Sequence, residues 1–136
     1  MIQYTCACGA CTVKAEGAPA MQLYCHCDDC QASSGAPFVA RAIYTKGAIA
    51  VMAGETRAWV YKTNRRTFCA ACGVTLFSEP PGDRVIAANA SLFLKGQFQP
   101  QAHVQCQSAV AQIKDGLPHY KTWPPAFGGS GELVDW

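Results

Sequence analysis

The sequence predicts a small, mainly β domain that is stapled by zinc, and three observations support this prediction. Short runs of β-type residues recur between Gly, Pro and Asn. No long stretch keeps an apolar period of 3.6 residues, so long helices are not expected. Seven of the nine cysteines fall into three tight clusters, which is the pattern of metal ligands. We therefore expect antiparallel sheets, folded over or curved into an open barrel, with a few short helical turns.

The expected strands follow one another along the first two thirds of the chain, each bounded by turn-forming residues. They span residues 11–15, 21–24, 38–44, 49–52, 58–61, 74–77 and 85–88. Helical turns are expected at only two places, over residues 28–33 and near residues 91–95. Because these turns are so short, the sheets must supply most of the core.

A chain of 136 residues, half of them apolar, is long enough for one domain with its own core and too short to divide comfortably into two. We expect this domain to span residues 1–124, and residues 125–136 to form a tail from which Leu133 and Trp136 dock back. The formal net charge of +2 and the scattered basic residues argue against nucleic-acid binding. No run of about 18 apolar residues predicts a membrane span.

Disulfide bonds are the main alternative use of so many cysteines, since small secreted domains often depend on them. The residues before Cys6 contain no basic segment, apolar stretch or cleavage site of the kind that secretion requires. The number of cysteines is odd, and the thiols of a Cys-X-Cys pair are poorly placed to bond with each other. We therefore expect zinc and a cytoplasmic location, although four thiolates alone do not distinguish zinc from iron or an iron–sulfur cluster.

Two of the clusters each supply a pair of ligands, and together they complete a tetrahedral structural site. The pairs are Cys6 and Cys8, and Cys69 and Cys72. A metal clip across roughly 60 intervening residues removes much conformational freedom from the unfolded chain. Gly9 and Gly73 directly follow the two pairs and suit turns that need a positive φ. We expect this site to be closed and to hold the fold.

The middle cluster, Cys25, Cys27 and Cys30, supplies three ligands within six residues. A zinc site with three protein ligands keeps a position open for water or substrate, so this cluster is the expected catalytic centre. Thiolate ligands lower the Lewis acidity of zinc compared with histidines, which favours activation of a thiol over hydrolysis. His26 lies between two of the cysteines and is either a further ligand or a residue outside the ligand shell.

Five ordered blocks of the sequence resemble the glutathione-dependent formaldehyde-activating enzyme family, which includes centromere protein V. The blocks are residues 6–10, 25–31, 34–38, 68–77 and 100–103. The resemblance runs from Cys6 to about Trp123. It implies a mainly β fold of the Mss4-like type, with two zinc ions per chain. The structural ion would match the four paired cysteines, and the catalytic ion would match the three-cysteine cluster.

The resemblance also implies an activity, the addition of glutathione to formaldehyde to give S-hydroxymethylglutathione. This is formally a carbon–sulfur lyase reaction run backwards, so the expected partners are a small thiol and a small aldehyde. Glutathione is anionic, and the basic residues that could receive its carboxylates are Arg41, Lys62, Arg65 and Arg66. Apart from this possible role, we interpret Arg65 and Arg66 as part of a solvated turn. The alternative function, suggested by the centromere and Mss4-like relatives, is a zinc-stabilised binding module without catalysis.

The chain departs from the family pattern at several positions. Cys11 stands where a small aliphatic residue is usual and is either a core thiol or a ligand. Cys106 is either a fourth ligand that closes the second site or a free strand cysteine. Phe93 and its neighbour stand where the family often has acidic residues. His103 and His119 match family positions, in a structural or a catalytic role.

Overall fold

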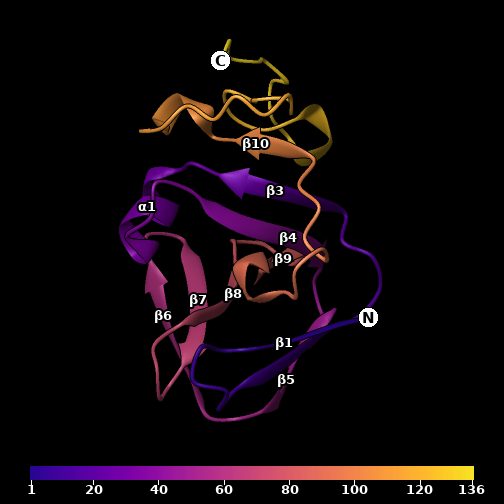
Figure 1. Ribbon diagram of the computed structural model, residues 1–136, viewed down its shortest axis with the longest axis vertical. Coiled ribbons are helices and arrows are strands. Elements are labelled where there is room, and N and C mark those ends of the chain that lie inside the picture. Colours follow the sequence, from indigo (N-terminus) through magenta and orange to yellow (C-terminus); the bar gives the residue numbers. More distant parts are fainter. The chain divides into compact units, whose positions relative to one another are not determined.

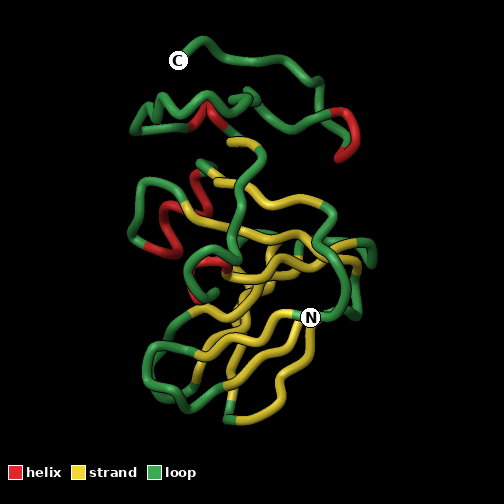
Figure 2. Tube along the Cα trace, turned by 45° about the vertical axis from the view of Figure 1, so that its right-hand side comes forward, coloured by secondary structure: helices red, strands yellow, loops and turns green.

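The computed structural model describes residues 1–136 and is mainly β, as predicted. Figure 1 shows the strands and the single α-helix, and Figure 2 shows that helical segments are few and short. The chain forms two compact units. The first unit contains Met1–Met21 and Arg41–Phe98, and the second contains Gln22–Ala40 and Gln99–Trp136. No helix of the structure has the length and apolar character needed to span a membrane.

The first unit contains a three-stranded antiparallel sheet in the order β1-β2-β5. Its strands are β1 (Ile2–Thr5), β2 (Thr12–Ala15) and β5 (Ile49–Ala53). Strand β2 shows the expected period of two, because Val13 and Ala15 are fully buried whereas Thr12 and Lys14 are half-buried. One face of this small sheet therefore contributes to the core of the unit.

The other strands of the first unit lie in the order β4-β9-β8-β7-β6, and each neighbouring pair is antiparallel. They are β4 (Val39–Thr45), of which the last five residues belong to this unit, β6 (Thr56–Tyr61), β7 (Asn64–Cys69), β8 (Thr75–Glu79) and β9 (Val85–Asn89). A short 3-10 helix, η1 (Ala90–Leu92), follows β9. Tyr4 of β1 donates a hydrogen bond of 2.9 Å from its hydroxyl to the Leu76 carbonyl of β8, so the two sheets of this unit are joined in its core.

The second unit contains β3 (Met21–Cys25), whose last four residues belong to it, the helix α1 (Asp28–Ser34) and β10 (Ala102–Val104). Two 3-10 helices, η2 (Cys106–Ser108) and η3 (Pro125–Phe127), lie in its later segment. Strand β10 pairs with β3 in parallel, which is an exception within the mainly antiparallel architecture that the sequence predicted. A parallel pair needs a long connection, and here that connection is residues 26–101.

All seven expected strands are present, with boundaries that differ by one or two residues. Strands β1, β7 and β10 were not expected. Strand β7 was not predicted because it contains two adjacent charged residues, Arg65 and Arg66. The interpretation of this pair as a solvated turn was therefore wrong. Arg66 is only 1% exposed. The helical turn expected near residues 91–95 is the shorter η1, which begins at Ala90.

The tail docks within the second unit, as predicted for two of its residues. Leu133 forms an antiparallel backbone bridge with Tyr120. The ring centroid of Trp136 lies 4.6 Å from that of His119 and 5.3 Å from that of His26. The last residues of the chain therefore cover a group of histidines.

Candidate metal centres

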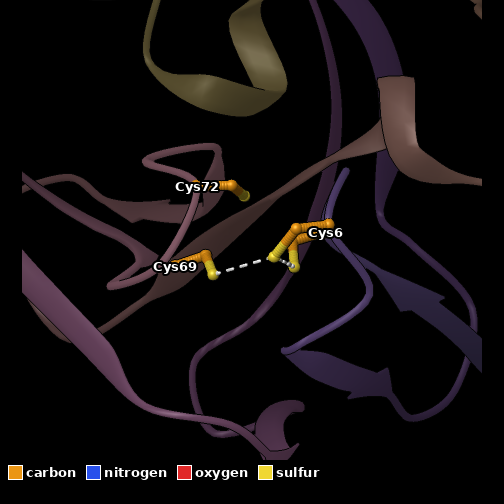
Figure 3. Close-up of side chains that lie close together, drawn as sticks. Cys6, Cys69 and Cys72 are labelled. Atoms are coloured by element: carbon orange, nitrogen blue, oxygen red, sulfur yellow. Dashed lines mark hydrogen bonds between the residues drawn. The ribbon is translucent and has the colours of Figure 1, made fainter.

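The four cysteines predicted to form a closed site come together in the first unit. Their sulfur atoms all lie within 4.8 Å of one another. The Sγ atoms of Cys6 and Cys8 are 3.5 Å apart, and those of Cys8 and Cys69 are 3.8 Å apart. With zinc–sulfur bonds of about 2.3 Å, the edge of a tetrahedron is about 3.8 Å, so this donor set fits a zinc ion. Figure 3 shows Cys6, Cys69 and Cys72 grouped in this way.

Two turns of the same kind present these cysteines. The Gly9 amide donates to the Cys6 carbonyl at 3.0 Å, and the Gly73 amide donates to the Cys69 carbonyl at 2.8 Å. Both glycines have a positive φ, 79° and 77° respectively, as the sequence predicted. The positive φ lets each loop fold back tightly beneath its pair of thiols.

The four thiols influence one another strongly. The Cys11 amide donates to the Cys6 sulfur at 3.2 Å and lowers the pKa of Cys6 to about 6. The amide of Ala10 favours the Cys8 thiolate, but the neighbouring thiols outweigh this effect and raise the pKa of Cys8 to about 12. Adjacent thiolates repel each other, so four of them need a bound cation to exist together.

Cys11 is a core thiol and lies outside this four-cysteine cluster. Its side chain is fully buried, and its thiol donates to the Glu55 carbonyl at 3.3 Å. Burial raises the pKa of the Cys11 thiol to about 11. The neutral thiol is therefore the form that the core stabilises.

The three cysteines predicted to form an open site come together in the second unit, with their sulfur atoms within 4.8 Å of one another. Cys25 ends β3, Cys27 is the N-cap of α1, and Cys30 lies in the first turn of that helix. The Cys30 amide donates to the Cys27 sulfur at 3.2 Å. Cys25 and Cys30 are buried, whereas Cys27 is half-buried, so the cluster is reached from solvent at Cys27.

Cys25 has a strongly perturbed pKa. The thiols of Cys27 and Cys30, together with burial, raise its pKa well above the ordinary value for cysteine. Cys106 is not part of this cluster. It begins η2 rather than lying in a strand, and burial raises its pKa to about 11. Three thiols, and not four, therefore converge here.

His26 lies between two of these cysteines in the sequence, but its ring contacts that of His103. Its Nε2 is 2.8 Å from Nδ1 of His103, and its side chain is fully buried. Burial and the neighbouring histidines lower the pKa of His26 to about 4. At neutral pH this imidazole is therefore uncharged, and its partner in the structure is His103 rather than the three-cysteine cluster.

A further cluster joins His103, Asp115 and His119, whose ligand atoms also lie within 4.8 Å of one another. The sequence analysis singled out the two histidines but missed Asp115. The only signal for it was its position four residues before His119, which is weak in a segment without regular structure. Burial disfavours the charged carboxylate, but hydrogen bonds from His103 and the Leu117 amide outweigh this effect and lower the pKa of Asp115.

The basic residues considered for glutathione differ in exposure. Arg41 and Arg66 are buried, so they are not surface charges, whereas Lys62 and Arg65 are exposed. The Arg66 guanidinium lies 5.8 Å from the centroid of the Tyr61 ring, and its Nε and Nη1 atoms have no hydrogen-bond partner. Stacking on the tyrosine ring offsets part of the cost of burying this cation.

Phe93, at a position where the resemblance leads us to expect acidic residues, is a core residue. Its side chain is 9% exposed, and its ring centroid lies 5.3 Å from that of Tyr4. A carboxylate in this place would be desolvated against an aromatic ring. The departure from the family pattern is therefore accommodated by packing in the first unit.

Comparison with known proteins agrees with the geometry. A family model described as "Glutathione-dependent formaldehyde-activating enzyme" matches residues 1–108. No curated protein matches the chain. Among solved structures, the chain is similar to the crystal structure of a protein from Rhodobacter sphaeroides, with 24% sequence identity and a TM-score of 0.54, over 70% of this chain and 89% of that one. At this level of identity the likeness concerns the fold alone.

Proposed function

Because the chain belongs to the glutathione-dependent formaldehyde-activating enzyme family, we propose that it is a zinc-dependent carbon–sulfur lyase acting on adducts of thiols with small aldehydes. In the favoured reaction, the sulfur of glutathione forms a bond to the carbon of formaldehyde. The thiol proton passes to the former carbonyl oxygen, which gives S-hydroxymethylglutathione. The observation that carries this proposal is the convergence of exactly three thiols, those of Cys25, Cys27 and Cys30, with one edge open to solvent.

The chain's own residues prepare this centre for a thiol substrate. The bend between β3 and α1 holds the three sulfur atoms together, and the Cys30 amide fixes the Cys27 side chain. Cys27 is the half-buried member of the cluster, so it is the side from which a fourth group could approach. When bound there, zinc would supply the positive charge that keeps an incoming sulfur near its thiolate form at neutral pH. Holding the thiol and the aldehyde together would convert a two-body encounter into a positioned one.

The four-cysteine cluster would have a different role. Its four ligands, Cys6, Cys8, Cys69 and Cys72, leave no open position, so a second zinc ion bound there would be structural. Each chain would then carry one structural and one catalytic zinc ion.

Exchange spectroscopy tests the reaction, because the uncatalysed addition of thiols to formaldehyde is already fast. Glutathione and ¹³C-formaldehyde are brought to equilibrium, and NMR measures how quickly the label passes between free aldehyde and adduct. We expect the protein to accelerate this exchange and Cys27→Ser to return it to the uncatalysed rate. The matched control is Cys106→Ser, which alters a buried cysteine of the same unit outside the cluster.

Two results would count against catalysis. Exchange that is unchanged by the protein would favour the binding module, especially if native mass spectrometry still showed a zinc-dependent glutathione adduct. Equal loss of exchange in Cys27→Ser and Cys106→Ser would show that the three-cysteine cluster has no special role.

A further inference from the structure

We propose that His103, Asp115 and His119 form a third metal site, separate from both cysteine clusters, which takes a divalent transition-metal ion such as Zn²⁺. Two imidazole nitrogens and a carboxylate are a donor set that suits zinc and related ions. Both histidines are buried, at 0% and 6% exposure, whereas the Asp115 side chain is 28% exposed. The cluster therefore combines a buried nitrogen face with a carboxylate at which an ion can enter.

The ligand atoms already converge on one place. The Nε2 atom of His103 lies 2.7 Å from one carboxylate oxygen of Asp115, and the Nε2 atom of His119 lies 3.4 Å from the other. With bonds of about 2.1 Å, the edge of a tetrahedral site is about 3.4 Å. The three ligand atoms lie within 4.8 Å of one another, so small movements of the side chains would bring them to this spacing. The carbonyl oxygen of Ile113 lies 2.7 Å from His119 Nε2 and offers a further donor beside the same nitrogen.

The surroundings orient the ligands as residues around metal sites commonly do. His26 makes a hydrogen bond of 2.8 Å to Nδ1 of His103, the ring nitrogen that faces away from Asp115. The Leu117 amide donates to Asp115 at 3.1 Å and holds the carboxylate. The rings of His103 and His119 stack with centroids 4.5 Å apart, and the Trp136 ring packs against them. Each ligand is thus held before any ion arrives.

A metal ion at this cluster would stabilise a segment of the chain that has no regular secondary structure. Between η2 and His119, residues 109–118 form no helix or strand, so few regular backbone hydrogen bonds hold them. An ion bound to ligands at both ends of this segment would close it as a clip and stabilise the folded form. Asp115 and His119 follow residue 108, the last residue that the family model matches. His103 lies within the matched range, so the family model covers only one of the three ligands.

The alternative to a bound metal ion is a set of hydrogen bonds between the same side chains. In the metal-free protein, Nε2–H of His103 can donate to Asp115 while Nε2–H of His119 donates to the Ile113 carbonyl. A divalent ion bound at Nε2 of both rings would need the tautomer in which each proton is on Nδ1, and Nδ1–H of His103 could then donate to His26. The ion would also offset the negative charge of the carboxylate, which protons on neutral imidazoles do not. The two arrangements therefore differ in metal content, and this difference can be counted.

Metal counting by native mass spectrometry is the first test. The full chain is saturated with Zn²⁺, freed of excess, and compared with Asp115→Asn and His119→Gln. We expect one zinc ion fewer in each variant than in the parent protein, or an affinity for that ion weaker by roughly 10-fold to 100-fold. The matched control is Asp83→Asn, which alters an exposed carboxylate of the first unit and should leave the count unchanged. Equal zinc counts in the parent and both variants would overturn the proposal.

Cobalt spectroscopy of the parent protein gives an answer that does not depend on how the variants fold. Co²⁺ is added to protein in which the cysteine clusters already hold zinc. We expect one further equivalent to bind, with d–d absorption but no sulfur-to-cobalt charge-transfer band, because this site has no thiolate. A charge-transfer band at the further equivalent would show that the ion binds to thiolates instead. Either that result or the absence of binding would contradict the proposal. Activity in the exchange assay is a separate readout, so failure of the lyase proposal leaves this test intact.

Discussion

The two cysteine clusters differ in how many thiols meet at one place, four in one and three in the other. Cys6, Cys8, Cys69 and Cys72 could supply all four ligands of a tetrahedral zinc site, whereas Cys25, Cys27 and Cys30 could supply three. The chemistry of the thiol is the same in both clusters. The number of ligands decides whether the ion serves only the fold or could also meet a substrate.

Single substitutions should separate these roles. We expect Cys69→Ser to unfold or strongly destabilise the protein, since it opens the structural cluster at a fully buried position. Cys27→Ser should leave the protein folded, because Cys27 is half-buried, and should abolish lyase activity. Thermal unfolding followed by circular dichroism measures the first effect, and the exchange assay measures the second. Equal loss of folding in both variants would contradict the division of roles.

Two buried tyrosines of the first unit differ in whether the hydroxyl group has a hydrogen-bond partner. The Tyr4 hydroxyl donates to the Leu76 carbonyl, whereas the Tyr44 hydroxyl is buried without a hydrogen-bond partner. We expect Tyr4→Phe to lower the free energy of unfolding by about 1–2 kcal/mol and Tyr44→Phe to leave it unchanged or raise it. Urea titration measures both. A larger loss in Tyr44→Phe than in Tyr4→Phe would show that the hydrogen bond is not what matters.

At the scale of elements, the turns around the four-cysteine cluster are packed closely against the neighbouring strands. The loop that carries Cys6 and Cys8 leads directly into β2, and the turn from β5 to β6 passes beside it at Gly54. A Cβ atom added at Gly54 would lie 2.3 Å from the Ala10 carbonyl oxygen and 2.7 Å from the Cys11 Cα atom. This close approach of two backbones admits only glycine.

Gly54→Ala should therefore be costly, and Gly82→Ala provides its control. Both glycines have a positive φ, 93° and 95°, but a Cβ atom at Gly82 meets open space. Both variants carry the backbone strain of alanine at positive φ, about 1–2 kcal/mol. Only Gly54→Ala adds a clash, which should cost about 1–3 kcal/mol more. Chemical denaturation of the two variants measures the difference, and equal losses would argue against the clash.

At the scale of the whole molecule, 136 residues form two compact units, each of which contains one of the cysteine clusters. Small chains bury too little surface for a large margin of stability, so metal ions can contribute much of it. The four-cysteine cluster joins segments more than sixty residues apart, as Cys8 and Cys69 are separated by 61 positions. Loss of its ion should therefore affect the chain well beyond the two loops.

Removal of zinc with a strong chelator should lower the midpoint of thermal unfolding, and added Zn²⁺ should restore it. Added Mg²⁺ should not, because magnesium prefers oxygen ligands. Differential scanning calorimetry measures the midpoint, while native mass spectrometry confirms that the ions have left. A metal-free protein that unfolds at the same temperature as the zinc-bound protein would show that the clusters do not hold the fold.

Local patterns in the sequence were enough to predict seven of the ten strands and both cysteine clusters. Ligand spacing, the glycines at residues 9 and 73, and alternation such as that around Val13 are short-range signals that survive in any tertiary arrangement. They also sufficed to identify the family. Strand β10 carried no such signal, because three residues are too few to show a period and its partner β3 lies far away in the sequence.

By itself, the sequence determined which thiols are paired, where chain reversals must occur and that β structure dominates. Only the tertiary structure decided that Arg66 is buried in a strand and that Asp115 meets His103 and His119 beneath Trp136. The physical reason is the range of the signals. Ligand pairs and turns depend on residues a few positions apart, whereas the burial of a polar side chain and the meeting of distant ligands depend on contacts that form only when the chain has folded.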